Sequence, residues 1–240
     1  LMSAIKAKFE RQLPLTILID NPTIWSLARV LARSSDLADE SPLVALQTKG
    51  RLSPLFCVPG TGGSVIYLRS LANEMIEFDT PFYGLQAIRS PETNQPIQDI
   101  TEIANLNIKA LLAVQREGPY QLCGHSFGSW VALEMAFQLQ NAGHQVSQLI
   151  VLDTGIPSAK DLSRIKNWDD SEWLLTIAKT IGDTYNKNLL IDKTNLENLS
   201  WDEKIFLLFN KMRDGGLIDQ QGSLEDVRSL VEMYKAQAQT

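Results

Sequence analysis

Residues 120–143 read YQLCGHSFGSWVALEMAFQLQNAG, an apolar run, a turn bounded by glycines, and a helical segment ended by glycine. The turn contains the pattern G-x-S-x-G with Ser126 at its centre. A tight strand-to-helix turn strains the backbone of its central residue, and the two glycines allow neighbouring backbone to approach closely. This context predicts that Ser126 is a nucleophile at the carboxyl edge of a sheet. The alternative is a serine that only caps the helix.

The alternation of strand and helix extends to both sides of this stretch. The predicted strands are 43–46, 55–59, 82–88, 120–124 and 148–153, and the predicted helices between them are 65–75, 99–115 and 127–143. Strands that alternate with helices require right-handed crossovers and a mostly parallel sheet, so the predicted fold class is α/β. The apolar run LIVL in the last strand is typical of a strand that is covered on both faces.

Changes in composition divide the chain into four segments. Residues 34–42 are polar and acidic without apolar periodicity, and we interpret them as a linker between residues 1–33 and an α/β core at 43–158. Residues 159–240 contain three helical segments and no convincing strand. Such a helical block is either an extra packed layer or a lid over a site. The alternation in the core lacks its closing strands.

The bulk composition excludes several classes of protein. The 240 residues are 44% hydrophobic and 21% charged, which is ordinary for a soluble globular protein. A net charge of -6 argues against nucleic-acid binding. Cys57 and Cys123 lie in apolar runs and are interpreted as buried hydrophobic residues, not as a disulfide or metal pair. Without a membrane span or signal-peptide layout, the chain is predicted to be cytoplasmic.

A serine that transfers acyl groups also needs N–H donors for the oxyanion. The backbone N–H of Phe127, the residue after the nucleophile, is the first candidate. The glycine-rich loop VPGTGGS (58–64) follows an earlier strand, and the Thr61 N–H is the second candidate. The loop could instead be a flexible connector. A phosphate-binding role is less favoured because GTGGS matches neither G-x-G-x-x-G nor a loop ending in Lys-Ser/Thr.

Asp153 ends the strand after the nucleophile helix, so it is predicted at the same sheet edge as Ser126 and is the candidate acid. Its alternative role is to cap the turn DTGIP.

The chain has two histidines. His125 adjoins the serine in a sharp turn, where neighbouring side chains diverge. His144 lies about 16 helical residues further on, or about 24 Å. A general base must lie within about 3 Å of its proton. We therefore expect the base beyond Thr240 or in a second chain; otherwise the serine does no chemistry.

Four motifs strongly resemble the thioesterase domains that end polyketide, nonribosomal-peptide and fatty-acid synthase lines: YGLQA, EGPYQLCGHSFG, ALEMAFQL and LIVLDT. The similarity is highly specific over 82–153 and weak over 160–222. It implies an α/β-hydrolase fold with a helical lid. The resemblance also assigns the nucleophile to Ser126, the acid to Asp153, and the oxyanion donors to Thr61 and Phe127.

The family's histidine follows the lid and two further strands, which implies that it lies beyond Thr240 and that this fragment alone is inactive. Residues 1–33 resemble the end of an acyl- or peptidyl-carrier domain, with an unrelated helical hairpin as the alternative. The implied partner is a carrier domain that delivers the substrate on phosphopantetheine, and the thioesterase itself needs no cofactor. Exposed apolar faces of lid helices could also pair two copies of the chain.

The implied reaction is acyl transfer through an acyl-serine. The thiol of the carrier leaves first, and water or an intramolecular nucleophile then releases an acid or a macrocycle. The sequence does not specify the acyl substrate or choose between hydrolysis and cyclisation. The alternatives are a generic α/β-hydrolase esterase and an inactive, truncated fragment that only binds carriers.

Overall fold

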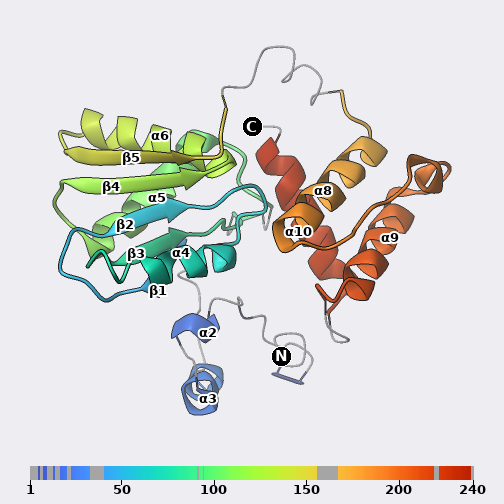
Figure 1. Ribbon diagram of the computed structural model, residues 1–240, viewed down its shortest axis with the longest axis horizontal. Helices are drawn as coiled ribbons and strands as arrows, with labels where there is room; N and C mark the ends of the chain where they lie inside the picture. Colours follow the sequence, from blue (N-terminus) through green and yellow to red (C-terminus); the bar gives the residue numbers. More distant parts are fainter. Residues whose placement is uncertain are drawn as a thin grey trace. The chain divides into compact units, whose positions relative to one another are not determined.

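The structure is a computed structural model that describes residues 5, 8–9, 13, 17–20, 23–32, 41–90, 92–93, 95–155, 167–218 and 222–238. Most of the predicted linker at 34–42 lies outside these residues. The chain divides into two compact units, one that contains the strands and one that is helical (Figure 1).

The strand-containing unit holds α2 (Ile17–Asp20), α3 (Ile24–Ala32), β1 (Leu43–Gln47), β2 (Leu55–Val58), the 3-10 helix η1 (Ile66–Leu68), α4 (Arg69–Glu74), β3 (Phe82–Leu85), α5 (Ile100–Val114), β4 (Tyr120–His125), α6 (Phe127–Asn141) and β5 (Val146–Leu152). The helical unit holds α8 (Asp170–Tyr185), the 3-10 helix η2 (Lys193–Leu196), α9 (Trp201–Asp214) and most of α10 (Leu224–Ala238).

The five strands form one sheet in the order β1-β3-β2-β4-β5. β1 runs antiparallel to β3, and the other three pairs are parallel, which confirms the predicted α/β class. The third strand is shorter than the predicted 82–88. Beyond Leu85, the N–H of Gln86 donates to Pro42 O and that of Ala87 to Gly63 O, so this backbone bonds to loops instead of a strand.

Each face of the sheet is covered by a different pair of helical segments. Phe56 and Val58 of β2 pack in a hydrophobic cluster with residues of α5 and α6. The alternate residues Leu55 and Cys57 pack in a second cluster with residues of η1 and α4. Because successive side chains of a strand point to opposite faces, β2 contributes to both clusters. This burial on two sides fixes the carboxyl ends of β2 and β4, where the candidate site lies.

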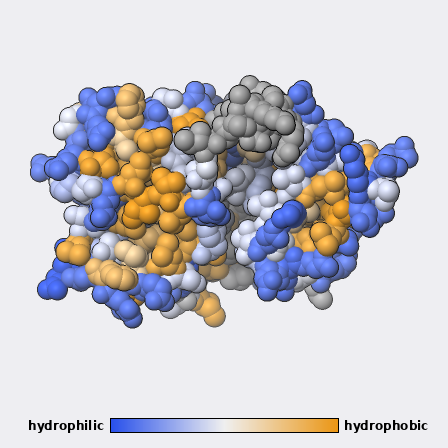
Figure 2. Space-filling view, turned by 45° about the horizontal axis from the view of Figure 1, so that its top comes forward, coloured by the Kyte–Doolittle hydropathy of each residue, from blue (hydrophilic) through white to orange (hydrophobic). Residues whose placement is uncertain are grey.

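The last strand is covered only in part, although its apolar run predicts full cover on both faces. β5 pairs with β4, its one strand partner in the described part of the chain. Val151 of β5 is 51% exposed, and Leu133 and Phe137 of α6 are 49% and 60% exposed. Figure 2 shows apolar residues gathered on the surface of this unit. An apolar run raises the tendency to be buried but does not determine which faces are covered.

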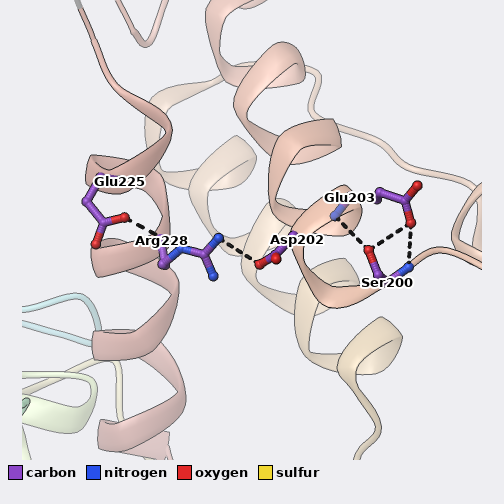
Figure 3. Close-up of polar contacts among 5 residues, drawn as sticks. All are labelled: Ser200, Asp202, Glu203, Glu225 and Arg228. Atoms are coloured by element: carbon purple, nitrogen blue, oxygen red, sulfur yellow. Dashed lines mark hydrogen bonds and ion pairs between the residues drawn. The ribbon is translucent and has the colours of Figure 1, made fainter.

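The helical unit contains no strand among its described residues, as the sequence predicts. Asp169 and Ser200 cap α8 and α9, and each belongs to a capping box. Figure 3 shows the second box, in which Ser200 and Glu203 bond to one another. A neutral or charged side chain that accepts the free N–H groups of a first turn stabilises the helix.

Charged side chains connect α8, α9 and α10. Arg228 of α10 donates to Asp202 of α9 at 2.7 Å, and the arginine also lies 3.6 Å from Glu225 in its own helix (Figure 3). Lys235 Nζ lies 3.1 Å from Asp170 Oδ1 at the start of α8 and 4.4 Å from the ring centroid of Trp201 in α9. α10 is therefore linked to both α8 and α9.

We expect the helical unit to lose stability in acid. Hydrogen bonds from the backbone of Glu172 lower the pKa of Asp169, and hydrogen bonds from Ser200 lower the pKa of Glu203. Because both pKa values fall on folding, the stabilisation is present above the ordinary values of 3.8 and 4.5 and is lost as pH falls through the native values. Circular dichroism of the melting transition at pH 7 and pH 3 measures this loss. In a double variant, Asp169→Asn with Glu203→Gln, the melting temperature should change less between pH 7 and pH 3. A change as large as that of the wild type would show that these two carboxylates are not the cause.

Candidate active site

Ser126 occupies the turn between β4, which ends at His125, and α6, which begins at Phe127. Its backbone angles are φ 50° and ψ -123°, a conformation that non-glycine residues rarely adopt. Such strain persists where the surrounding structure imposes it, often at functional sites. The strand-to-helix connection therefore holds Ser126 in the geometry that the G-x-S-x-G pattern predicts.

The side chain of Ser126 does not cap the helix. Ser126 stands at the N-cap position of α6, yet its hydroxyl makes no capping hydrogen bond and has no hydrogen-bond partner in the described part of the chain. The side chain is partly exposed. A serine retained for capping would accept the N–H of the second or third helical residue. The geometry thus counts against the cap-only alternative.

Asp153 follows β5 as Ser126 follows β4. His125 and Leu152, the last residues of the two strands, are paired in register. The Ser126 N–H donates to Leu152 O at 2.9 Å, and the Thr154 hydroxyl donates to Ser126 O at 2.6 Å. Asp153 is exposed and also has a positive φ, 48°. The structure therefore brings the predicted nucleophile and acid to the same edge of the sheet.

The glycine-rich loop after β2 lies against this turn. A Cβ added at Gly60 would lie 3.3 Å from Ser126 Cβ. The Gly63 N–H donates to Gly60 O at 3.0 Å, and Gly63 O accepts the Ala87 N–H at 2.9 Å, so the loop is held in place. The Thr61 N–H has no acceptor among the described residues. This arrangement counts against a flexible connector.

The other predicted donor, the Phe127 N–H, also has no acceptor among the described residues. Phe127 is the first residue of α6, where an N–H has no intrahelical acceptor. No acceptor for it occurs elsewhere among the residues that the structure describes. The positive end of the helix dipole at this position favours negative charge beside it. Both predicted oxyanion donors are thus backbone N–H groups that remain available.

Neither histidine makes a hydrogen bond to Ser126 among the described residues. His125 Nδ1 lies 2.8 Å from the Tyr67 hydroxyl, so this ring nitrogen is engaged by the tyrosine. His144 packs edge-on against Tyr120, with ring centroids 5.6 Å apart. Tyr120 begins β4 and Ser126 follows its end, about 20 Å away at about 3.3 Å per residue. Tyr67 belongs to none of the four motifs, and Thr154 ends the motif LIVLDT without any pattern that indicates its bond to Ser126 O.

The described residues offer no group of three or more His, Cys, Asp or Glu side chains that could hold a metal ion. Cys57 and Cys123 are paired in register on β2 and β4, and both are buried and free of disulfides. The hydrogen bond with Cys123, together with burial, raises the pKa of the Cys57 thiol. Among the described helices, none is long and apolar enough to cross a membrane.

A family model described as "Thioesterase domain" matches residues 53–238. The chain belongs to the thioesterase domain family. The match confirms the resemblance inferred from the four sequence motifs, and with it the assignment as a thioesterase enzyme. The matched range includes parts of both units and every predicted site residue.

Two curated relatives are indigoidine synthases. This chain is 41% identical over 162 residues to the indigoidine synthase of Streptomyces lavendulae. The alignment covers 67% of this chain and 12% of the relative. It is 35% identical over 228 residues to the indigoidine synthase of Dickeya dadantii. This alignment covers 91% of this chain and 15% of the relative. The chain thus spans less than a sixth of the length of these two proteins.

Solved structures support the fold. A four-domain nonribosomal peptide synthetase, holo-AB3403, aligns with 99% of this chain and 18% of its own at a TM-score of 0.73 and 22% identity. The Vlm2 thioesterase domain, solved with a dodecadepsipeptide, aligns with 82% of this chain and 70% of its own at a TM-score of 0.54 and 17% identity. At these identities the likeness concerns the fold, which agrees with the predicted α/β-hydrolase class.

Proposed function

We propose that this thioesterase releases an acyl or peptidyl chain from the phosphopantetheine thioester of a carrier domain, through an acyl-serine on Ser126. The observation that carries the proposal is the strained turn at Ser126, with its free hydroxyl and with Asp153 at the same sheet edge. The hydroxyl oxygen bonds to the thioester carbon, and the carrier thiol leaves with a proton. Water or an internal nucleophile then attacks the ester and regenerates the serine.

Two backbone donors stabilise the charge that develops on the carbonyl oxygen. We assign them to the N–H groups of Thr61 and Phe127, which have no acceptor among the described residues. One good donor of this kind stabilises the transition state by about 3–4 kcal/mol. Because the α6 dipole acts at the same position, the charge is stabilised without reorganisation.

The proton of Ser126 requires a histidine that these 240 residues do not supply. We assign the general base to a histidine beyond Thr240, oriented by Asp153, as the family's order of nucleophile, acid and base implies. The environments of His125 and His144 support this assignment, since each ring is engaged elsewhere. The chain alone should therefore turn over slowly or not at all.

The partner is a carrier domain of the same assembly line. Residues 1–33 are assigned to the end of that domain, 34–42 to the linker, 43–158 to the thioesterase core and 159–240 to the lid. The alignment with the Dickeya dadantii relative, over 91% of the chain, supports a shared arrangement. The substrate arrives on phosphopantetheine, and the thioesterase itself uses no cofactor. Pairing of two copies through lid helices remains part of the proposal.

The substrate class is tested on the intact protein that includes the general base. We expect a pantetheine thioester to be cleaved faster than the oxygen ester with the same acyl group, because the site would be built for a thiol leaving group. Steady-state rates for the matched pair, with free thiol and free acid measured separately, provide the comparison. Preference for the oxygen ester would instead support a generic esterase.

A fluorophosphonate probe tests the state of the serine. We expect Ser126 to be labelled in the intact protein and to react far more slowly in the 240-residue chain, which lacks the base. Peptide mapping by mass spectrometry locates the label. The absence of labelling in both forms would support an inactive carrier-binding fragment and overturn the proposed function.

A further inference from the structure

Tyr67 joins the glycine-rich loop to the residue before the nucleophile. Its hydroxyl oxygen accepts the Gly60 N–H at 2.8 Å and lies 2.8 Å from His125 Nδ1. The two rings meet edge-on with centroids 5.5 Å apart. One hydroxyl of η1 therefore contacts both the loop after β2 and the last residue of β4, 58 residues away in sequence.

This contact lies one peptide away from the one that carries the Thr61 N–H. The carbonyl of Gly60 and the N–H of Thr61 belong to one planar peptide unit and point in opposite directions. The Gly63 N–H holds that carbonyl at 3.0 Å, and Tyr67 holds the N–H on the other side of Gly60. Glycine has little conformational preference of its own, so these bonds fix the direction of the Thr61 N–H.

The size of residue 60 explains why a hydrogen bond is needed there. A Cβ at Gly60 would lie 2.9 Å from His125 Nδ1 and 3.3 Å from Ser126 Cβ. The close approach of loop and turn requires glycine, and glycine leaves the loop free to rotate. The Tyr67 hydroxyl restores the missing constraint without adding bulk at the contact.

We propose that Tyr67 and His125 are positioning residues, which align the Thr61 N–H with Ser126. The Gly60 N–H donates to Tyr67 Oη, and in the contact between Tyr67 Oη and His125 Nδ1 we assign the nitrogen as the acceptor. The inference rests on the proposed function, since it concerns the proposed oxyanion donor. His125 acts as an acceptor for the tyrosine and does not take the proton of Ser126. An error of about 1 Å in such an alignment can cost up to about 100-fold in rate.

The test compares variants of the intact protein with a pantetheine thioester. We expect Tyr67→Phe to lower kcat by about 10- to 100-fold with little change in KM, because the lost interaction acts on the transition state. His125→Leu should have a similar effect. His125→Asn should retain most of the rate, since its amide oxygen can accept at the place of Nδ1. The Tyr67→Phe, His125→Leu double variant should be no slower than the worse single variant.

A matched control and a separate probe distinguish the possible outcomes. Tyr83 of β3 stacks on Phe56, so Tyr83→Phe should leave kcat unchanged. If the wild-type serine is not labelled by the fluorophosphonate, the proposed function fails. If it is labelled, but Tyr67→Phe matches the wild type or His125→Asn is as slow as His125→Leu, only the positioning role is overturned. Melting temperatures identify variants whose loss of rate comes from unfolding.

Discussion

Replacing Ser126 by alanine should lower the turnover of a pantetheine thioester by about 10⁴- to 10⁶-fold in the intact protein, the range expected when a nucleophilic serine is removed. The physical reason is the loss of the oxygen that forms the acyl-enzyme. Binding should survive, because the oxyanion donors are backbone groups that do not depend on this side chain. The measurements are kcat and KM, together with the binding of a non-cleavable thioester analogue.

The matched control for this variant is Ser70→Ala. Ser70 is an exposed serine of α4 in the same unit, so its replacement should leave both turnover and melting temperature unchanged. Ser126→Ala should also melt like the wild type, since its hydroxyl has no partner in the described residues. A Ser126→Ala variant that retains a tenth of the wild-type rate would exclude an acyl-serine mechanism.

The nucleophile turn could be predicted from the sequence because its determinants are local. A strand, a glycine-bounded turn and a helix each leave a pattern within residues 120–143, and the strained φ of Ser126 follows from their junction. Asp153 could be predicted for a related reason. Parallel strands end at one sheet edge, so the residue after β5 lies beside the residue after β4.

The roles of Tyr67 and Thr154 could not be predicted, because they depend on contacts distant in sequence. Tyr67 lies on η1, within a segment that the apolar periodicity assigns to one helix over 65–75. The segment instead begins with a 3-10 turn, in which the Leu68 N–H donates to Val65 O. Periodicity does not separate these two helix types over so few residues.

The partial exposure of β5 could not be predicted from its own residues. Its apolar residues predict burial, yet burial depends on which elements lie beside the strand. Apolar residues in a strand favour burial, but the elements that pack beside the strand determine which of its side chains are buried. The contact of His125 with Tyr67 could not be predicted either. The position of His125 beside the serine indicates only that it is not the base, whereas its hydrogen bond with Tyr67 joins residues that are 58 positions apart in the sequence.

Replacing Gly128 by alanine should disrupt the site and destabilise the strand-containing unit by about 2–3 kcal/mol, as expected for overpacking against rigid surroundings. A Cβ at Gly128 would lie 2.3 Å from Val58 O and 2.4 Å from Pro59 O. Both are backbone atoms, so no side-chain rotation can relieve the overlap. Because these carbonyls begin the glycine-rich loop, relief must move the loop away from Ser126. Urea unfolding and the rate of fluorophosphonate labelling measure the two effects.

Gly155→Ala is the matched control, because a Cβ there would meet no atom of the described residues within 4 Å and the residue lacks a positive φ. It should change the free energy of unfolding by less than about 0.5 kcal/mol. The contrast separates close backbone approach from a general cost of replacing glycine near the site. If Gly128→Ala were as stable as Gly155→Ala and were labelled at the wild-type rate, α6 could not begin in contact with the loop after β2. The alignment proposed for Thr61 and Ser126 would then lose its structural basis.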